Sequence, residues 1–208
     1  METVKLDRRF GREAFGNDPA NYHRGRPPYP QATWTALRER AGLKAGIDIL
    51  EIGAGSGLAT RTLLGHRPRR LVAVEPDGRL ADYLRASIDD ARLDIVTAPF
   101  ETADLEPASF DLVAAATAFH WLDPINSLKK IHDLLRPGGA IALWWNVFGD
   151  AGRMPSTTKP FISSRIARPA RRAAMPNGCL TGWTPRPVSG NWPPLASLPT
   201  HRNFSRGR

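Results

Sequence analysis

The chain has 208 residues, a formal net charge of +9 and a single cysteine, Cys179. Its length suits one ordinary α/β domain, and the lone cysteine excludes an intramolecular disulfide and a cysteine-based metal cluster. Residues 1–12 are charged rather than apolar, and no apolar run approaches the roughly 18–20 residues of a membrane helix. We therefore expect a cytoplasmic protein with no membrane partner.

The charges and the prolines are distributed unevenly along the chain. Residues 1–150 hold 19 Lys and Arg against 20 Asp and Glu, whereas residues 151–208 hold ten Lys and Arg and no acid. Nine of the 19 prolines also lie after residue 150, where they interrupt helices and remove strand donors. We therefore predict a cap segment over residues 1–30, a folded domain over residues 31–150 and a basic, disordered tail over residues 151–208.

In chain order, the first predicted element is a short helix over residues 30–41, whose Trp34, Leu37 and Ala41 share one stripe. Five apolar runs of strand length follow it, at residues 47–52, 71–75, 93–97, 110–116 and 140–146. Helices are predicted between them: one over residues 58–64, one after Asp77 and one after Asp123. Residues 99–109 form either one helical turn or a loop.

Near-continuous apolarity in the five runs is typical of parallel strands covered on both faces. Strands alternating with helices predict an α/β fold, a doubly wound, mostly parallel, Rossmann-like sheet with right-handed crossovers. No stretch after residue 148 keeps a helical or strand periodicity, so we expect no further strand. The outer side of the strand at residues 140–146 is then an open edge, which predicts poor solubility or a non-native oligomer.

A glycine-rich turn carries the strongest functional signal. Residues 51–57, the glycine turn, read Glu-Ile-Gly-Ala-Gly-Ser-Gly after the first predicted strand, and the second strand ends in Glu75. Such a turn lets the backbone approach a ligand, and a carboxylate at the next strand end can accept hydrogen bonds from both ribose hydroxyls. The dinucleotide fingerprint has its third glycine where this chain has Leu58, which disfavours a nicotinamide-dependent oxidoreductase. The alternative is a turn with a purely structural role.

Several segments in this order resemble the class I S-adenosylmethionine-dependent methyltransferases. The acid-x-Gly-x-Gly-x-Gly turn is joined by residues 110–113 and 119–121, which are similar to the family's fourth strand and the loop beyond it. Residues 134–139 are similar to its link into strand five, and residues 21–30 to its N-terminal cap. The resemblance covers residues 10–150 and favours the small-molecule, trans-aconitate methyltransferase-like (type 11) branch, here without that branch's last two strands.

The resemblance implies S-adenosylmethionine as the cofactor and a small molecule as the methyl acceptor. In the family the glycine turn approaches the methionine part of the cofactor, an acid holds the ribose, and residues after strand three surround the adenine. By position, the implied cofactor-binding residues are Tyr22, Arg26, Glu51, Gly53, Ala54, Gly55, Gly57, Glu75, Pro76, Pro99 and Phe100. Glu51 could also favour a cationic ligand by its charge, and the Phe100 ring is equally consistent with a place in the core.

His120 is the candidate catalytic base, because a histidine titrates near neutral pH and this one lies just beyond the fourth strand. The alternative is that His120 and Trp121 only shape the cofactor pocket. Tyr22 and His23 reach the same mouth if the cap folds over it. The five histidines show no metal-ligand spacing, so no metal site is expected.

Two arginines of the cap have open roles. Arg24 and Arg26 either hold an anionic acceptor, which the guanidinium fork suits, or anchor the cap to a surface acid. Asp111, at the start of a strand, is expected to be structural.

The tail allows two hypotheses: a reading-frame product of a GC-rich coding sequence, or a basic arm for nucleic acid. Its arginines are dispersed rather than clustered with aromatic residues, which argues against a nucleic-acid partner. We predict a methyltransferase for a small-molecule acceptor, with its activity impaired by the aberrant C-terminus. The alternative is a catalytically inactive cofactor-binding module or partner subunit whose basic tail mediates contacts.

Overall fold

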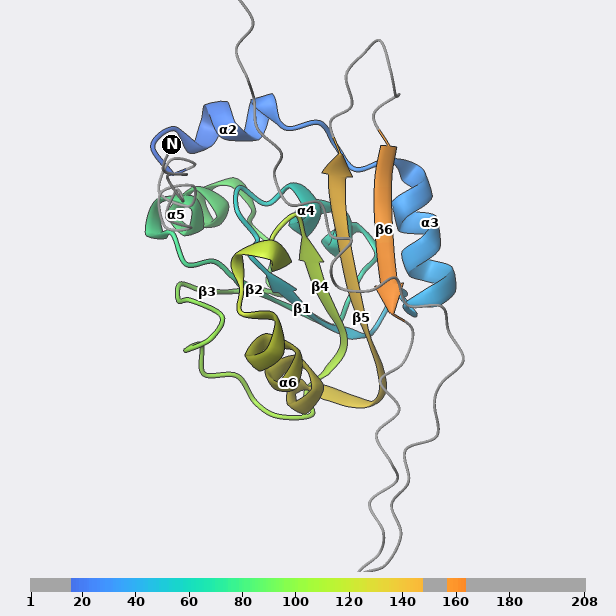
Figure 1. The fold of residues 1–208 in the computed structure, drawn as a ribbon. Helices are drawn as coiled ribbons and strands as arrows, with labels where there is room; N and C mark the ends of the chain where they lie inside the picture. The colour runs from blue at the N-terminus through green and yellow to red at the C-terminus, as the bar shows by residue number, and fades with distance from the viewer. Residues whose placement is uncertain (1–15, 148–156, 164–208) are drawn as a thin grey trace, which may run out of the picture. The chain divides into compact units, whose positions relative to one another are not determined.

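The structure, a computed structural model, describes residues 16–147 and 157–163, which all fall within residues 1–171. Six strands form one sheet in the order β3-β2-β1-β4-β5-β6 (Figure 1). The strands are β1 Asp48–Ile52, β2 Arg70–Val74, β3 Leu93–Val96, β4 Phe110–Ala116, β5 Leu135–Val147 and β6 Thr157–Ser163. The first five are parallel, which confirms the predicted α/β fold. Of the tail over residues 151–208, the structure describes only residues 157–163. The disorder predicted for the rest of the tail lies outside the described residues.

The predicted helices are confirmed, together with their start signals. They are α3 Gln31–Arg40, α4 Leu58–Gly65, α5 Gly78–Ser87 and α6 Pro124–Leu134. Helix α2 Pro19–Gly25 and the 3-10 turn η1 at Phe119–Trp121 were not predicted. The Asp77 side chain accepts a hydrogen bond from the Arg79 amide at 2.9 Å, and Asp123 accepts one from the Asn126 amide at 2.8 Å. Both aspartates are therefore N-caps that satisfy otherwise unpaired amides of the first turn. None of the helices in the described residues is long and apolar enough to cross a membrane.

Helices cover the sheet on both faces, so its strands are apolar on both sides (Figure 1). On one face, α3, α4 and α5 contribute Leu37, Leu63 and Leu84 to a buried cluster. On the other face, α6 contributes Ile131 and Leu134 to a second buried cluster. Side chains alternate along each strand, so neighbouring residues of β1 and β4 join different clusters. The sheet is thereby a rigid platform whose carboxyl edge stays available for a site.

The last strand corrects one prediction. β6 pairs antiparallel with β5 from Ile141 to Val147, so the prediction that no strand follows residue 148 is wrong. The outer side of β5 is not an open edge, and poor solubility no longer follows from it. The segment combines β-branched and aromatic residues with one proline, Pro160, which the unpaired side of an edge strand tolerates. Its dense proline surroundings concealed this strand signal.

The start of β5 also differs from the prediction. The strand begins at Leu135, directly after α6, rather than at Ala140. Its pairing with β4 is irregular there, since Phe110 faces Leu135 and Leu112 already faces Ala140. The intervening residues include Gly138, which has a φ of +82°. They form a bulge-like irregularity at the first residues of the strand instead of a separate loop.

A charged network ties the amino ends of the strands together. Asp48, with a side chain only 6% exposed, pairs with Arg69 and accepts a hydrogen bond from Arg136 at 2.6 Å. Arg136 also donates to Asp111 at 2.8 Å, and Asp111 accepts from the Asp48 amide at 2.9 Å. The network joins β1, β4 and β5 with the residue that precedes β2. Asp111 therefore has the structural role that was expected.

Candidate functional site

The candidate site lies beyond the carboxyl ends of β1 and β4. These strands are neighbours in the sheet, and from them the strand order runs outward in opposite directions. Open α/β sheets bind ligands in the crevice at such a switch point. Here the crevice is narrow at its base, because a Cβ added to Gly53 would lie 2.5 Å from the Ala118 Cβ. Gly53 has a φ of +69°, so glycine is needed for both the conformation and the close approach.

The glycine turn directs most of its amides into the protein. The Gly53 and Ala54 amides donate to the Val74 carbonyl at 2.8 and 3.3 Å, and the Gly57 amide donates to the Ala54 carbonyl at 3.0 Å. A dinucleotide or P-loop turn instead aims its amides at phosphate oxygens. A ligand can therefore approach the α-carbons of the turn, which carry no side chains. The turn offers few amides to an anion. Like the glycine spacing, this geometry argues against a nicotinamide dinucleotide as the ligand.

Glu75 faces the turn from the end of β2. Its Oε2 accepts a hydrogen bond from the Gly55 amide at 2.7 Å, and its Oε1 accepts one from the Asp77 amide at 3.0 Å. The residue is only 5% exposed. Gly55 and Glu75, which are 20 residues apart in sequence, thus form two walls of one crevice. Pro76 follows at the rim and is half-buried.

Glu51 lies beneath the turn rather than at its mouth. The residue is 1% exposed, and its Oε2 accepts a hydrogen bond from the Thr60 hydroxyl at 2.7 Å. Burial raises the pKa of Glu51 to about 8, against the opposing effect of the Thr60 hydrogen bond. At neutral pH Glu51 therefore mostly keeps its proton. It links β1 to α4, and its charge contributes little to attracting a cation.

Helix α2 covers the glycine turn. The Tyr22 ring lies 4.0 Å from the position of a Cβ on Gly55, and His23 Nδ1 hydrogen-bonds the Ser56 hydroxyl at 3.0 Å. The Arg26 guanidinium lies 4.9 Å from the centre of the Tyr22 ring. Burial raises the pKa of the Tyr22 hydroxyl, with Arg26 opposing and Glu75 adding to that shift. The structure therefore brings Tyr22 and Arg26 to the crevice.

Polar groups also gather beyond β4 and β5. The Tyr29 hydroxyl hydrogen-bonds the Thr117 hydroxyl at 3.1 Å, and the Trp145 indole donates to His120 Nδ1 at 3.1 Å. Asn146 donates to the Pro27 carbonyl at 3.1 Å, which joins the end of β5 to the cap. Sequence reasoning missed these contacts of Tyr29, Thr117 and Trp145. Placement next to the ends of two neighbouring strands is the signal that identifies them.

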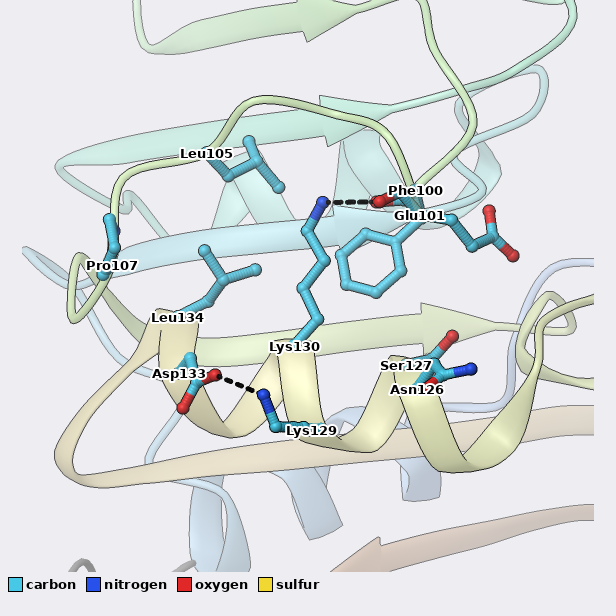
Figure 2. A pocket seen from close by; sticks show the side chains of 10 residues that line it. All are labelled: Phe100, Glu101, Leu105, Pro107, Asn126, Ser127, Lys129, Lys130, Asp133 and Leu134. Atoms are coloured by element: carbon cyan, nitrogen blue, oxygen red, sulfur yellow. Dashed lines mark hydrogen bonds and ion pairs between the residues drawn. The ribbon is translucent and has the colours of Figure 1, made fainter.

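The Phe100 ring lies in the core, whereas the adenine-binding role of Pro99 stays a prediction. The Pro99 carbonyl accepts the amides of Thr102 and Ala103, so these residues form one turn. The Phe100 side chain is buried in the cluster on the α6 face, with the Lys130 ammonium 5.1 Å from its ring centre (Figure 2). Lys130 also donates to the Phe100 and Ala103 carbonyls at 2.7 and 2.6 Å. Of the two alternatives for this ring, the structure shows the core position.

A cavity of about 360 Å³ lies between α6 and residues 100–107 (Figure 2). Its walls combine apolar side chains, including Leu105 and Leu134, with a rim of charged residues that includes Glu101 and Lys129. It lies on the α6 side of the domain, with Phe100 of that core cluster in its wall.

Arg24, which was a candidate together with Arg26 for holding an anionic acceptor, is exposed at the end of α2.

Comparisons with known proteins agree with this geometry. Residues 50–143 match a family model described as a methyltransferase domain. An uncharacterised methyltransferase of Schizosaccharomyces pombe is 33% identical over 133 residues, and one of Mycobacterium tuberculosis is 37% identical over 133 residues. Each alignment covers 64% of this chain and 52% of the relative, so the chain spans about half the length of these curated relatives.

A solved structure is similar as well. The crystal structure of an S-adenosylmethionine-dependent methyltransferase from Mesorhizobium loti matches with a TM-score of 0.50 and 25% identity. The match covers 55% of this chain and 54% of that chain.

The fold and these comparisons identify a Rossmann-like methyltransferase domain of class I, whose cofactor is S-adenosylmethionine. Within that class, residues 50–143 match the family model described as a methyltransferase domain. The resemblance to the class I methyltransferases is thereby confirmed, whereas the small-molecule, trans-aconitate methyltransferase-like branch stays a prediction.

Proposed function

We propose that the chain binds S-adenosylmethionine between the glycine turn, Glu75 and helix α2, and transfers its methyl group to a small-molecule acceptor. The observation that carries this proposal is the 2.7 Å hydrogen bond between the Gly55 amide and the Glu75 carboxylate. It joins the turn and the acid in one crevice, and the Tyr22 ring lies against the same glycine. Each of these three features has a defined task toward such a cofactor.

The residues present fit the cofactor chemically. Among the residues that the structure describes, no side chain lies closer to the space beside Gly55 than the Tyr22 ring, so a ligand can approach the turn backbone. A carboxylate has about four lone-pair sites, so Glu75 can hold ribose hydroxyls in addition to the turn amide. When bound, S-adenosylmethionine supplies a methyl group that its sulfonium already activates. The main tasks left to the chain are to hold and orient both reactants and to exclude water.

The acceptor is proposed to lie beyond β4, beside the polar groups of Tyr29, Thr117 and His120. The hydroxyls of Tyr29 and Thr117 are hydrogen-bonded to each other, and His120 follows Thr117 closely in sequence, in η1. Helix α2, anchored by the contact between His23 and Ser56, would limit the access of water to the crevice. A small polar acceptor suits this arrangement, because hydroxyl and imidazole groups can orient it by hydrogen bonds.

Paired variants of the full-length chain test cofactor binding. Glu75→Gln should weaken the affinity for S-adenosylhomocysteine about 10–100-fold, because a charge-assisted hydrogen bond contributes about 1.5–3 kcal/mol. Glu101→Gln removes an exposed carboxylate beside the α6 cavity and should leave the affinity unchanged. Equal affinities for the two variants, or displacement of S-adenosylhomocysteine by NAD, would overturn the proposed site.

Turnover needs its own measurement. Transfer of a labelled methyl group to members of a panel of small acceptors would support the enzyme. Binding of the cofactor without transfer to any of them would favour the alternative, a cofactor-binding module without catalysis.

A further inference from the structure

We infer that Trp145 is a positioning residue that fixes the tautomer of His120, so that this histidine donates a hydrogen bond at Nε2 instead of acting as a base. The inference starts from the 3.1 Å contact in which the Trp145 indole N–H donates to His120 Nδ1. An indole nitrogen is a donor only, and a histidine nitrogen can accept only when it carries no hydrogen. Nδ1 is therefore bare, and in the neutral ring the hydrogen sits on Nε2.

The sheet holds this contact in place. His120 lies in η1, four residues after β4 ends at Ala116, and Trp145 lies on the neighbouring strand β5. In that pairing Ala116 is opposite Trp144, which precedes Trp145 directly. Trp145 itself is partly buried and packs against the apolar cluster on the α6 face. The donor is therefore fixed by strand pairing and core packing, not by the conformation of an exposed loop.

A second aromatic residue restrains the ring from another direction. The Trp121 ring lies 4.6 Å from the His120 ring, centre to centre, at 42°. This contact is between the two rings and restricts the tilt of the imidazole. Trp145 acts on the edge of the ring and selects the tautomer, so the two tryptophans have separable effects.

The selected tautomer decides what His120 can do. To take a proton at Nε2, the neutral ring would need its hydrogen on Nδ1, where it would face the indole N–H, another donor. An imidazolium has two N–H groups and meets the same conflict. At Nε2, His120 can therefore give a hydrogen bond but cannot take a proton. The identity of the group that accepts this hydrogen bond rests on the proposed function. The tautomer of His120 does not depend on that function.

Nitrogen NMR of the full-length chain, labelled with ¹⁵N at histidine, tests the inference without cofactor. The His120 signals are assigned by their loss in His120→Gln. In the wild type we expect one pyridine-type Nδ1 signal and one pyrrole-type Nε2 signal. In Trp145→Phe, which keeps an aromatic ring but removes the N–H, both signals should shift toward each other as the tautomers mix. The matched control Trp121→Phe should keep the wild-type pattern.

The outcomes separate this inference from the proposed function. Mixed tautomers in the wild type, or a wild-type pattern in a folded Trp145→Phe, would overturn it. If Trp145→Phe does not fold, Trp145→His provides the second variant, because it keeps a ring N–H in reach of His120. This variant should keep the wild-type Nε2 signal of His120. Mixed tautomers in it would count against the inference. Failure of S-adenosylhomocysteine to bind would contradict the proposed function and leave the tautomer measurement unaffected.

Discussion

Gly53 shows how a single residue gives access to the crevice. Its φ of +69° is unfavourable for other residues, and its α-carbon is so close to Ala118 that no methyl group fits between them. The end of β1 can therefore lie directly against the chain that leaves β4. The glycine-rich sequence predicted the conformation, but the contact with Ala118 depends on sheet order and could not be predicted locally.

Gly53→Ala tests this close approach against a matched substitution. We expect a loss of about 2–4 kcal/mol in unfolding free energy, from the left-handed conformation and from the clash with Ala118. Gly42 has a similar φ of +71° with open space around it, so Gly42→Ala should lose only about 1 kcal/mol. Urea denaturation measures both. Equal losses for the two variants would show that the contact with Ala118 has no energetic effect.

Glu51 gives a pH dependence whose sign follows from its raised pKa. Its pKa is 4.5 in the unfolded chain and about 8 in the fold, so the folded state holds the extra proton between these values. Stability from this group is complete below pH 4.5 and is lost as the pH rises toward 8, by at most about 1.4 kcal/mol per pH unit. Glu51→Gln keeps an acceptor for Thr60 and cannot ionise.

The unfolding free energy of the wild type minus that of Glu51→Gln is therefore expected to decrease as the pH rises from 4.5 to 8. Chemical denaturation at a series of pH values measures it. A difference that stays constant across this window would mean that Glu51 is ionised in the fold.

At the scale of elements, Arg136 connects three strands through two aspartates. Its side chain is 32% exposed and donates to Asp48 and Asp111. The hydrogen bond from Arg69, and with it the one from Arg136, lowers the pKa of Asp48 from its usual 3.8 despite burial. The stability that Asp48 contributes is thus present above pH 3.8 and is lost as the pH falls through its lower folded pKa.

Arg136→Met keeps the aliphatic volume and removes the charge. We expect a loss of about 1–3 kcal/mol near neutral pH, because Asp48 stays almost fully buried with one partner fewer. The exposed pair of Arg70 and Asp94 provides the control, and Arg70→Met should stay within about 0.5 kcal/mol of the wild type. Thermal and urea unfolding measure both. A loss no larger than in the control would make the network a surface feature without structural effect.

Most elements could be predicted because local signals and tertiary packing agree. Asp77 and Asp123 begin helices by capping them, and apolar runs become strands that are buried on both faces. β6 could not be predicted in the same way. In the described part of the chain its strand partner is β5, which is a non-local partner, and Pro160 weakens its local pattern. The early start of β5 likewise follows from its pairing with β4.

At the scale of the whole molecule, the crevice is a product of topology. Tyr22, Gly55, Glu75 and Ala118 come from four segments that meet only because β1, β2 and β4 are neighbours. The sequence predicted the turn and the acid as motifs. It could not predict that Glu51 is buried below the turn, or that the Phe100 ring belongs to the core on the α6 face. Both depend on which sheet face each side chain meets.

The most direct test of the proposed site is the crystal structure of the chain with S-adenosylhomocysteine. We expect the ribose hydroxyls at the Glu75 carboxylate, the amino-acid part along the glycine turn and α2 over both. A nucleoside bound elsewhere, or an empty crevice at saturating ligand, would contradict the site and the function proposed from it.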